Sequence, residues 1–128
     1  FYAPVSRVRH LPVGTSIGYN RTYTFSRDSR VATIQAGYAD GVSTVLANTG
    51  QVLINGDYYK IVGKISMDQF AVDVTGSKVK PGDNAIIWGG DDPEMKVENV
   101  AHKINKIPYE LFTGISNRVE KTYFQEKN

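Results

Sequence analysis

The sequence contains no cysteine and only two histidines, and its net charge is only +2. Without cysteine it can form neither a disulfide framework nor a thiolate metal site, which fits a reducing compartment such as the cytoplasm. His10 and His102 are far apart, so we expect ordinary surface histidines and no metal site. The net charge is too small, and the basic residues too scattered, to indicate a nucleic-acid partner or a membrane surface. No hydrophobic run approaches the length of a membrane span.

The composition is that of a folded globular domain. A chain of 128 residues with 41% hydrophobic residues is long enough to bury one core, so we predict a single domain over residues 1–128. The segment "FYAPVSRVRHL" has no initiator methionine and enters a strand-like pattern almost at once. We therefore expect a fragment of a longer chain.

Alternating or β-branched segments dominate, and Asn55-Gly56 joins two of them in the manner of a tight hairpin turn. The apolar spacing predicts one helix over about 97–106 that Pro108 would stop, and a short helical turn within 42–48. The sequence therefore predicts a mainly β fold, an antiparallel β-barrel-like domain or a sandwich, with one short helix. The expected strands lie within 5–11, 19–25, 31–36, 51–65 (two strands), 70–74 and 85–88.

The residues alone suggest chemistry only through tyrosine, because no nucleophile or nucleotide-binding motif is present. Tyr19 and Tyr23 are four positions apart, so in a strand both rings point to the same face. Such tyrosines are typical of half-buried sheets. A phenol, with a pKa near 10, acts as a base near neutral pH only where its surroundings lower that pKa. At this point the pattern indicates a β domain of unassigned function.

Five stretches in order resemble the C-terminal β domain of the pyridoxal-phosphate-dependent alanine racemases. They cover about residues 5–119 and read "IGYNRTYTF", "ATIQAGYADGVSTVL", "GQVLINGDYYKIVGKISMDQFAVDV", "GDNAIIWG" and "IPYELFTGISNRV". The resemblance implies an N-terminal barrel that holds pyridoxal 5'-phosphate on a lysine outside this chain. It also implies a head-to-tail homodimer in which this domain completes the partner's active site. The isolated fragment is then expected to be inactive.

The resemblance assigns roles residue by residue. Tyr19 falls on the family's catalytic tyrosine, one of the two bases that act on opposite faces of the amino-acid substrate. Met67 matches the residue whose backbone N–H binds the substrate carboxylate, and Tyr38 matches a tyrosine lining the entry corridor. Tyr23 has no such role and is assigned to packing, while Asp40 is expected to shape its turn.

One departure bears on the substrate. Alanine racemases typically have "ISYRV" where this chain has "ISNRV", which places Asn117 at a substrate-pocket tyrosine. Asn is smaller and its amide can bond an alcohol, so the pocket is expected to favour serine over alanine. An Asn here resembles the membrane-bound serine racemases of vancomycin resistance, which would place an upstream membrane anchor before a cytoplasmic racemase half. The alternative is that Asn117 is a neutral change.

A rival hypothesis is a non-catalytic β-barrel binding or dimerisation module that keeps the same scaffold. The two hypotheses differ in where they place the hydroxyl of Tyr19. The enzyme requires it at a concave rim beside the Met67 N–H, whereas the module has no such requirement.

Overall fold

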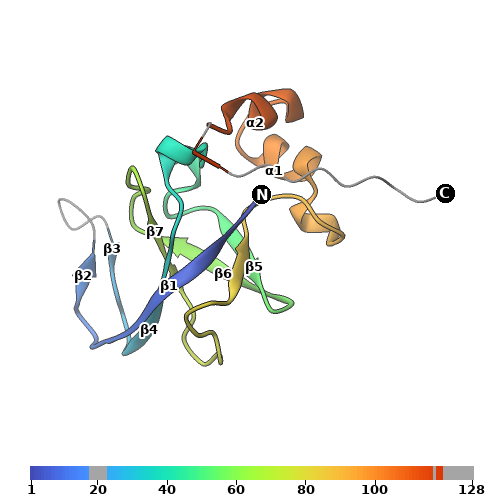
Figure 1. Cartoon of the computed structure of the whole chain (residues 1–128). Helices are drawn as coiled ribbons and strands as arrows, with labels where there is room; N and C mark the ends of the chain where they lie inside the picture. The colour runs from blue at the N-terminus through green and yellow to red at the C-terminus, as the bar shows by residue number, and fades with distance from the viewer. Residues whose placement is uncertain (18–22, 117, 120–128) are drawn as a thin grey trace.

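The structure is a computed structural model that describes residues 1–17, 23–116 and 118–119. Its centre is a closed antiparallel β-barrel of six strands, in the spatial order β1-β4-β7-β6-β5-β8 (Figure 1). This confirms the mainly β fold and decides between barrel and sandwich. The barrel strands are β1 (Tyr2–Leu11), β4 (Ser29–Ile34), β5 (Gln51–Ile54), β6 (Asp57–Val62), β7 (Phe70–Asp73) and β8 (Asn84–Ile86).

Short elements complete the fold around the barrel, and Figure 1 shows α1 and α2 side by side beyond one end of it. Two short strands form a separate sheet, β2 (Ser16–Ile17) with β3 (Tyr23–Thr24). Within the described part of the chain, no helix is long and apolar enough to cross a membrane. The helices are η1 (Tyr38–Asp40), η2 (Thr44–Leu46), η3 (Pro93–Met95), α1 (Val97–Lys103) and α2 (Pro108–Gly114).

Strand β1 closes the barrel because it pairs with two neighbours in succession. Its first residues pair with β8, with Tyr2 opposite Ile86, and the residues from Val5 onward pair with β4. The register shifts between Val5 and Arg7, which is the signature of a β-bulge that bends the strand. A closed barrel leaves no unpaired sheet edge, so the ends of the barrel are where loops can carry function.

Two apolar clusters hold these elements together. The large cluster fills the barrel with fully buried side chains such as Ile34, Ile54 and Ile61. The small cluster of Phe25, Val31 and Val62 lies under the β2–β3 sheet. Because Val31 and Ile34 belong to different clusters, both faces of β4 are buried, which explains its nearly continuous apolar sequence.

The local turn and packing predictions hold where the structure describes them. Asn55 and Gly56 have φ values of 52° and 86°, and they join β5 to β6 with Ile54 opposite Asp57. Tyr23 packs on the small cluster, with its ring 5.0 Å from that of Phe25. The helical turn expected within 42–48 is η2. Of the strand predicted over 19–25, residues 19–22 lie outside the described residues, and Tyr23–Thr24 form β3.

The single helix predicted over 97–106 is corrected to two. Helix α1 ends at Lys103, and Asn105 adopts a left-handed φ of 60° that breaks the helix. Pro108 follows this break and stands at the start of α2. The first turn of a helix tolerates proline because its N–H groups have no helical partner there. Pro108 therefore opens a helix where the sequence pattern suggested only a stop.

Candidate functional site

Three segments distant in the sequence meet beside one another, and we call residues 37–41, 66–69, 114–116 and 118–119 the three-loop cluster. The first segment is η1 with its flanking glycines. The N–H of Tyr38 donates to Ser66 O and that of Ala39 to Met67 O, both at 3.0 Å. A Cβ on Gly37 would overlap these two carbonyl oxygens, so only glycine permits this close approach. The "GYADG" loop therefore docks backbone to backbone on the "SMDQ" loop.

The second segment leaves one backbone donor, the N–H of Met67, without an acceptor among the described residues. Ser66 N–H donates to Gln69 O at 2.9 Å, whereas the carbonyls of Ser66 and Met67 accept from the first segment. Among the residues that the structure describes, none accepts a hydrogen bond from the N–H of Met67. Met67 is 51% exposed, so the chain here lies near the surface. Such an amide can donate to an anion.

The third segment follows α2 and docks on the first. Ser116 N–H donates to Asp40 O at 3.4 Å. A Cβ on Gly41, whose φ is 110°, would lie 2.6 Å from Gly114 O. Both glycines of "GYADG" are thus needed, Gly37 for contact with the second segment and Gly41 for contact with the third.

Arg118 links all three segments through its guanidinium. Its Nε lies 3.3 Å from Asp40 Oδ1, and its Nη2 lies 2.6 Å from Asp68 Oδ1. The side chain of Asp40 is 13% exposed, and its other oxygen accepts from the N–H of Gly37 at 2.9 Å. The hydrogen bond to Asp68 and the charge of Asp40 raise the pKa of Arg118 above its ordinary value. The guanidinium therefore remains charged at any pH near neutrality.

The structure brings two of the four predicted site residues together. Tyr38 and Met67 meet in the three-loop cluster, where Tyr38 is 49% exposed. Tyr19 and Asn117 lie outside the described residues. Asp40 shapes its turn as expected, since it closes η1 onto Gly37. In the sequence, Arg118 comes directly after Asn117.

Sequence reasoning missed Arg118 and Asp68 as members of the site. Asp40 and Asp68 stand 78 and 50 positions before Arg118, and no local pattern pairs charges over such separations. The one available signal was position, since Arg118 follows a residue of interest directly and Asp68 follows Met67.

A second tyrosine near a loop can be excluded as a base. Tyr58 donates its hydroxyl proton to Asp92, and this bond, with burial and the nearby carboxylates, raises the pKa of Tyr58 to about 12. A phenol with a raised pKa keeps its proton at neutral pH. Asp92 also accepts from Glu94 N–H at 2.9 Å, so its carboxylate caps the start of η3.

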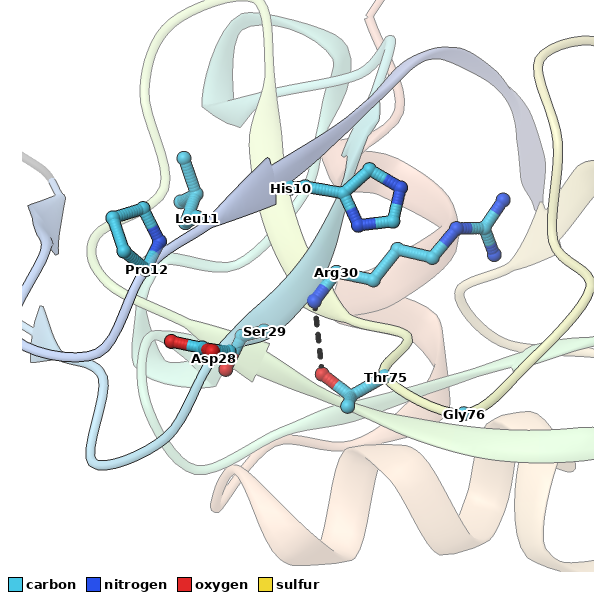
Figure 2. Close-up of a pocket in the computed structure, with 8 residues that line it drawn as sticks. All are labelled: His10, Leu11, Pro12, Asp28, Ser29, Arg30, Thr75 and Gly76. Atoms are coloured by element: carbon cyan, nitrogen blue, oxygen red, sulfur yellow. Dashed lines mark hydrogen bonds between the residues drawn. The ribbon is translucent and has the colours of Figure 1, made fainter.

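A cavity of about 490 Å³ lies elsewhere, where β1 ends and β4 begins (Figure 2). The backbone and guanidinium of Arg30, which lines this cavity, are already engaged. Arg30 N–H donates to Thr75 Oγ1 at 3.0 Å, and the Arg30 guanidinium donates to Ser77 O and Val79 O. His10 is exposed beside them. Within the described ranges, no three His, Cys, Asp or Glu side chains gather as metal ligands. The three-loop cluster, with its unused donor, is therefore the stronger candidate.

Solved structures share this fold closely. The chain superposes on "Alanine Racemase from Streptomyces coelicolor A3(2)" with a TM-score of 0.89 and 34% identity, covering 98% of this chain and 33% of that one. An alanine racemase from Bartonella henselae, solved with covalently bound pyridoxal phosphate, gives a TM-score of 0.86 and 37% identity over 96% of this chain and 34% of that one. These likenesses define a barrel domain of the amino-acid racemase class.

Sequence relatives identify the family. "Alanine racemase 2" of Caldanaerobacter subterraneus subsp. tengcongensis is 38% identical over 96% of this chain and 32% of its own length. The Cutibacterium acnes alanine racemase is 42% identical over 91% of this chain and 32% of its own length. The family "Alanine racemase, C-terminal domain" matches residues 1–123, and the chain belongs to this family. It spans about a third of the length of these relatives.

Proposed function

We propose that this chain is the C-terminal β domain of a pyridoxal-phosphate-dependent racemase that interconverts the L and D forms of alanine or serine. The observation that carries the proposal is the unused N–H of Met67 beside Tyr38, in a chain that belongs to the alanine racemase C-terminal family. The Bartonella henselae relative, which contains covalently bound pyridoxal phosphate, supports the choice of cofactor.

The three-loop cluster is suited to one end of the substrate. An amino acid carries a carboxylate, and the Met67 N–H is a donor of the kind that binds such an anion. No lysine belongs to the cluster, so its residues fit the substrate carboxylate and not the attachment of the cofactor. In the proposal the cofactor is held by a barrel domain outside this chain. The site is completed across a head-to-tail homodimer.

Racemisation removes the α-proton from one face of the substrate and returns a proton to the other face. Two bases on opposite sides are therefore required, and Tyr19 is proposed as one of them. Pyridoxal phosphate, when bound, supplies the electron sink that stabilises the carbanion. The other base is proposed to be the cofactor lysine. Met67 holds the carboxylate, so that the α-carbon stays oriented toward both bases.

Substitution of Tyr19 tests the proposal in the full-length enzyme. Tyr19→Phe deletes one base, so racemisation should slow by roughly 10²- to 10⁴-fold in both directions, because one base cannot serve both faces. One enantiomer should still exchange its α-proton with solvent through the remaining base. Polarimetry measures the racemisation, and NMR in D₂O measures deuterium incorporation without inversion.

Tyr23→Phe is the matched control, since Tyr23 packs on Phe25 and should leave the turnover intact. Unchanged racemisation in Tyr19→Phe would remove the proposed role of Tyr19. A full-length wild-type protein without racemase activity would favour the non-catalytic binding or dimerisation module instead.

We further propose that Asn117 gives the enzyme a preference for serine, as in the membrane-bound serine racemases of vancomycin resistance. The support is chemical, since the amide of Asn117 can bond a substrate hydroxyl where a tyrosine would fill the space. The same proposal places this domain in the cytoplasm, behind an upstream membrane anchor. Fractionation of cells that express the full-length protein tests it, because an enzyme found only in the soluble fraction would contradict the anchor.

A further inference from the structure

The ion pairs of Arg118 carry an inference that rests on, and deepens, the proposed function. One guanidinium contacts two carboxylates, Asp40 at 3.3 Å and Asp68 at 2.6 Å, which belong to different loops. The first loop also donates two backbone hydrogen bonds to the second, from Tyr38 N–H and Ala39 N–H. Backbone hydrogen bonds therefore already hold the two loops together. Arg118 adds a positive charge to this site as well as its contacts with the two carboxylates.

The charges matter because of what lies next to Asp68. Met67, the preceding residue, has the unused N–H that is proposed to bind a substrate carboxylate. Two carboxylates near this amide would repel an incoming anion. With Arg118 in place the three side chains carry a net charge of −1, and without it they would carry −2.

Strength alone does not distinguish this ion pair from others on the surface. The side chains of Arg118 and Asp68 are 50% and 54% exposed, and those of Lys103 and Glu94, which pair at 3.2 Å, are 51% and 59% exposed. Exposed pairs of this kind contribute little to stability. The difference is position, because Lys103 and Glu94 belong to α1 and η3 and not to the three-loop cluster.

We propose that Arg118 is a positioning residue, which offsets the charges of Asp40 and Asp68 and fixes their loops so that the Met67 N–H can donate a hydrogen bond to a substrate carboxylate. The carboxylate is charged before, during and after the proton transfers. Losing Arg118 should therefore weaken binding of the ground state and of the transition state alike, which raises KM and changes kcat little.

Arg118→Met in the full-length holoenzyme tests the proposal, with alanine as the substrate. We expect KM to rise roughly fivefold, in the range that exposed charge pairs provide, with kcat changed less than twofold. The rise should shrink in high salt, because salt screens charges near the surface. Adding Asp68→Asn to Arg118→Met removes one unbalanced negative charge and should bring KM back toward the wild-type value.

Lys103→Met is the matched control, since it breaks an equally exposed ion pair outside the cluster and should leave KM unchanged. A purely structural role for Arg118 would make the double variant worse than the single one and would not respond to salt. That result, or an unchanged KM in Arg118→Met, would overturn this inference while leaving the proposed function standing. A wild-type enzyme that does not racemise alanine or serine would overturn both.

Discussion

At the scale of single residues, the three-loop cluster depends on glycines and charged side chains whose roles come from contacts with residues distant in the sequence. Gly37 has an extended φ of −143°, which any residue adopts, so its backbone conformation gives no reason for glycine. The reason is the close approach of Ser66 O and Met67 O, contributed by a loop some thirty positions away. The resemblance to a known family drew attention to this segment, and the close approach of the two carbonyl oxygens explains why glycine stands at position 37.

Asn117 carries the prediction on specificity. In the full-length enzyme, Asn117→Tyr should fill the proposed space beside the substrate side chain and remove a hydrogen-bond partner for the serine hydroxyl. The kcat/KM ratio of serine to alanine should then fall by roughly three- to tenfold, the value of one ordinary hydrogen bond. Steady-state kinetics with both substrates measures the ratio.

Asn117→Ala separates the two parts of that explanation. It leaves the space open but deletes the amide, so it should lose the serine preference only if the amide bonds the hydroxyl. A ratio that does not change in either variant would show that Asn117 is neutral toward the substrate.

At the scale of elements, the sequence predicts best where a local rule decides the structure. The Asn55-Gly56 hairpin follows from two residues that tolerate positive φ, and η2 follows from a short apolar turn. The helix prediction failed at Pro108, because proline suits the first turn of a helix as well as the end of one. Only the break at Asn105, with its φ of 60°, distinguishes the two readings.

The turn before β8 provides a prediction on pH. Asp83 accepts hydrogen bonds from Lys80 N–H at 3.0 Å and Asn55 Nδ2 at 2.9 Å, and pairs with Lys80 Nζ at 3.1 Å. These bonds lower the pKa of Asp83 below its ordinary 3.8, the backbone bond contributing most. The stabilisation is therefore fully present above about pH 3.8 and is lost as the pH falls through the lowered pKa.

Urea unfolding of the chain between pH 2 and 6 measures this loss. Asp83→Asn should flatten part of the decrease in unfolding free energy at acid pH. Lys80→Met keeps the backbone N–H and the Asn55 amide, so it should retain most of the decrease. An Asp83→Asn variant with the wild-type pH profile would contradict the assignment.

At the scale of the whole molecule, the sequence predicts a barrel-like fold but not which strands pair with one another. Alternation in the sequence marks which residues face inward, and it does not say that β1 pairs with both β4 and β8. That double pairing closes the barrel and depends on a bulge between Val5 and Arg7 that no turn residue signals. Closure then sets the helices and the three-loop cluster at the ends of the strands.

This closure also predicts how the 128-residue chain behaves by itself. The barrel has its own buried core and no open sheet edge, so the chain should fold alone and unfold in urea in one cooperative transition. It should nevertheless not racemise alanine or serine, even with pyridoxal phosphate added. The proposed mechanism needs two bases on opposite faces of the substrate, and this chain is proposed to supply only Tyr19. Polarimetry of the chain beside the full-length enzyme measures the difference, and turnover by the chain alone would show that the second base lies within these residues.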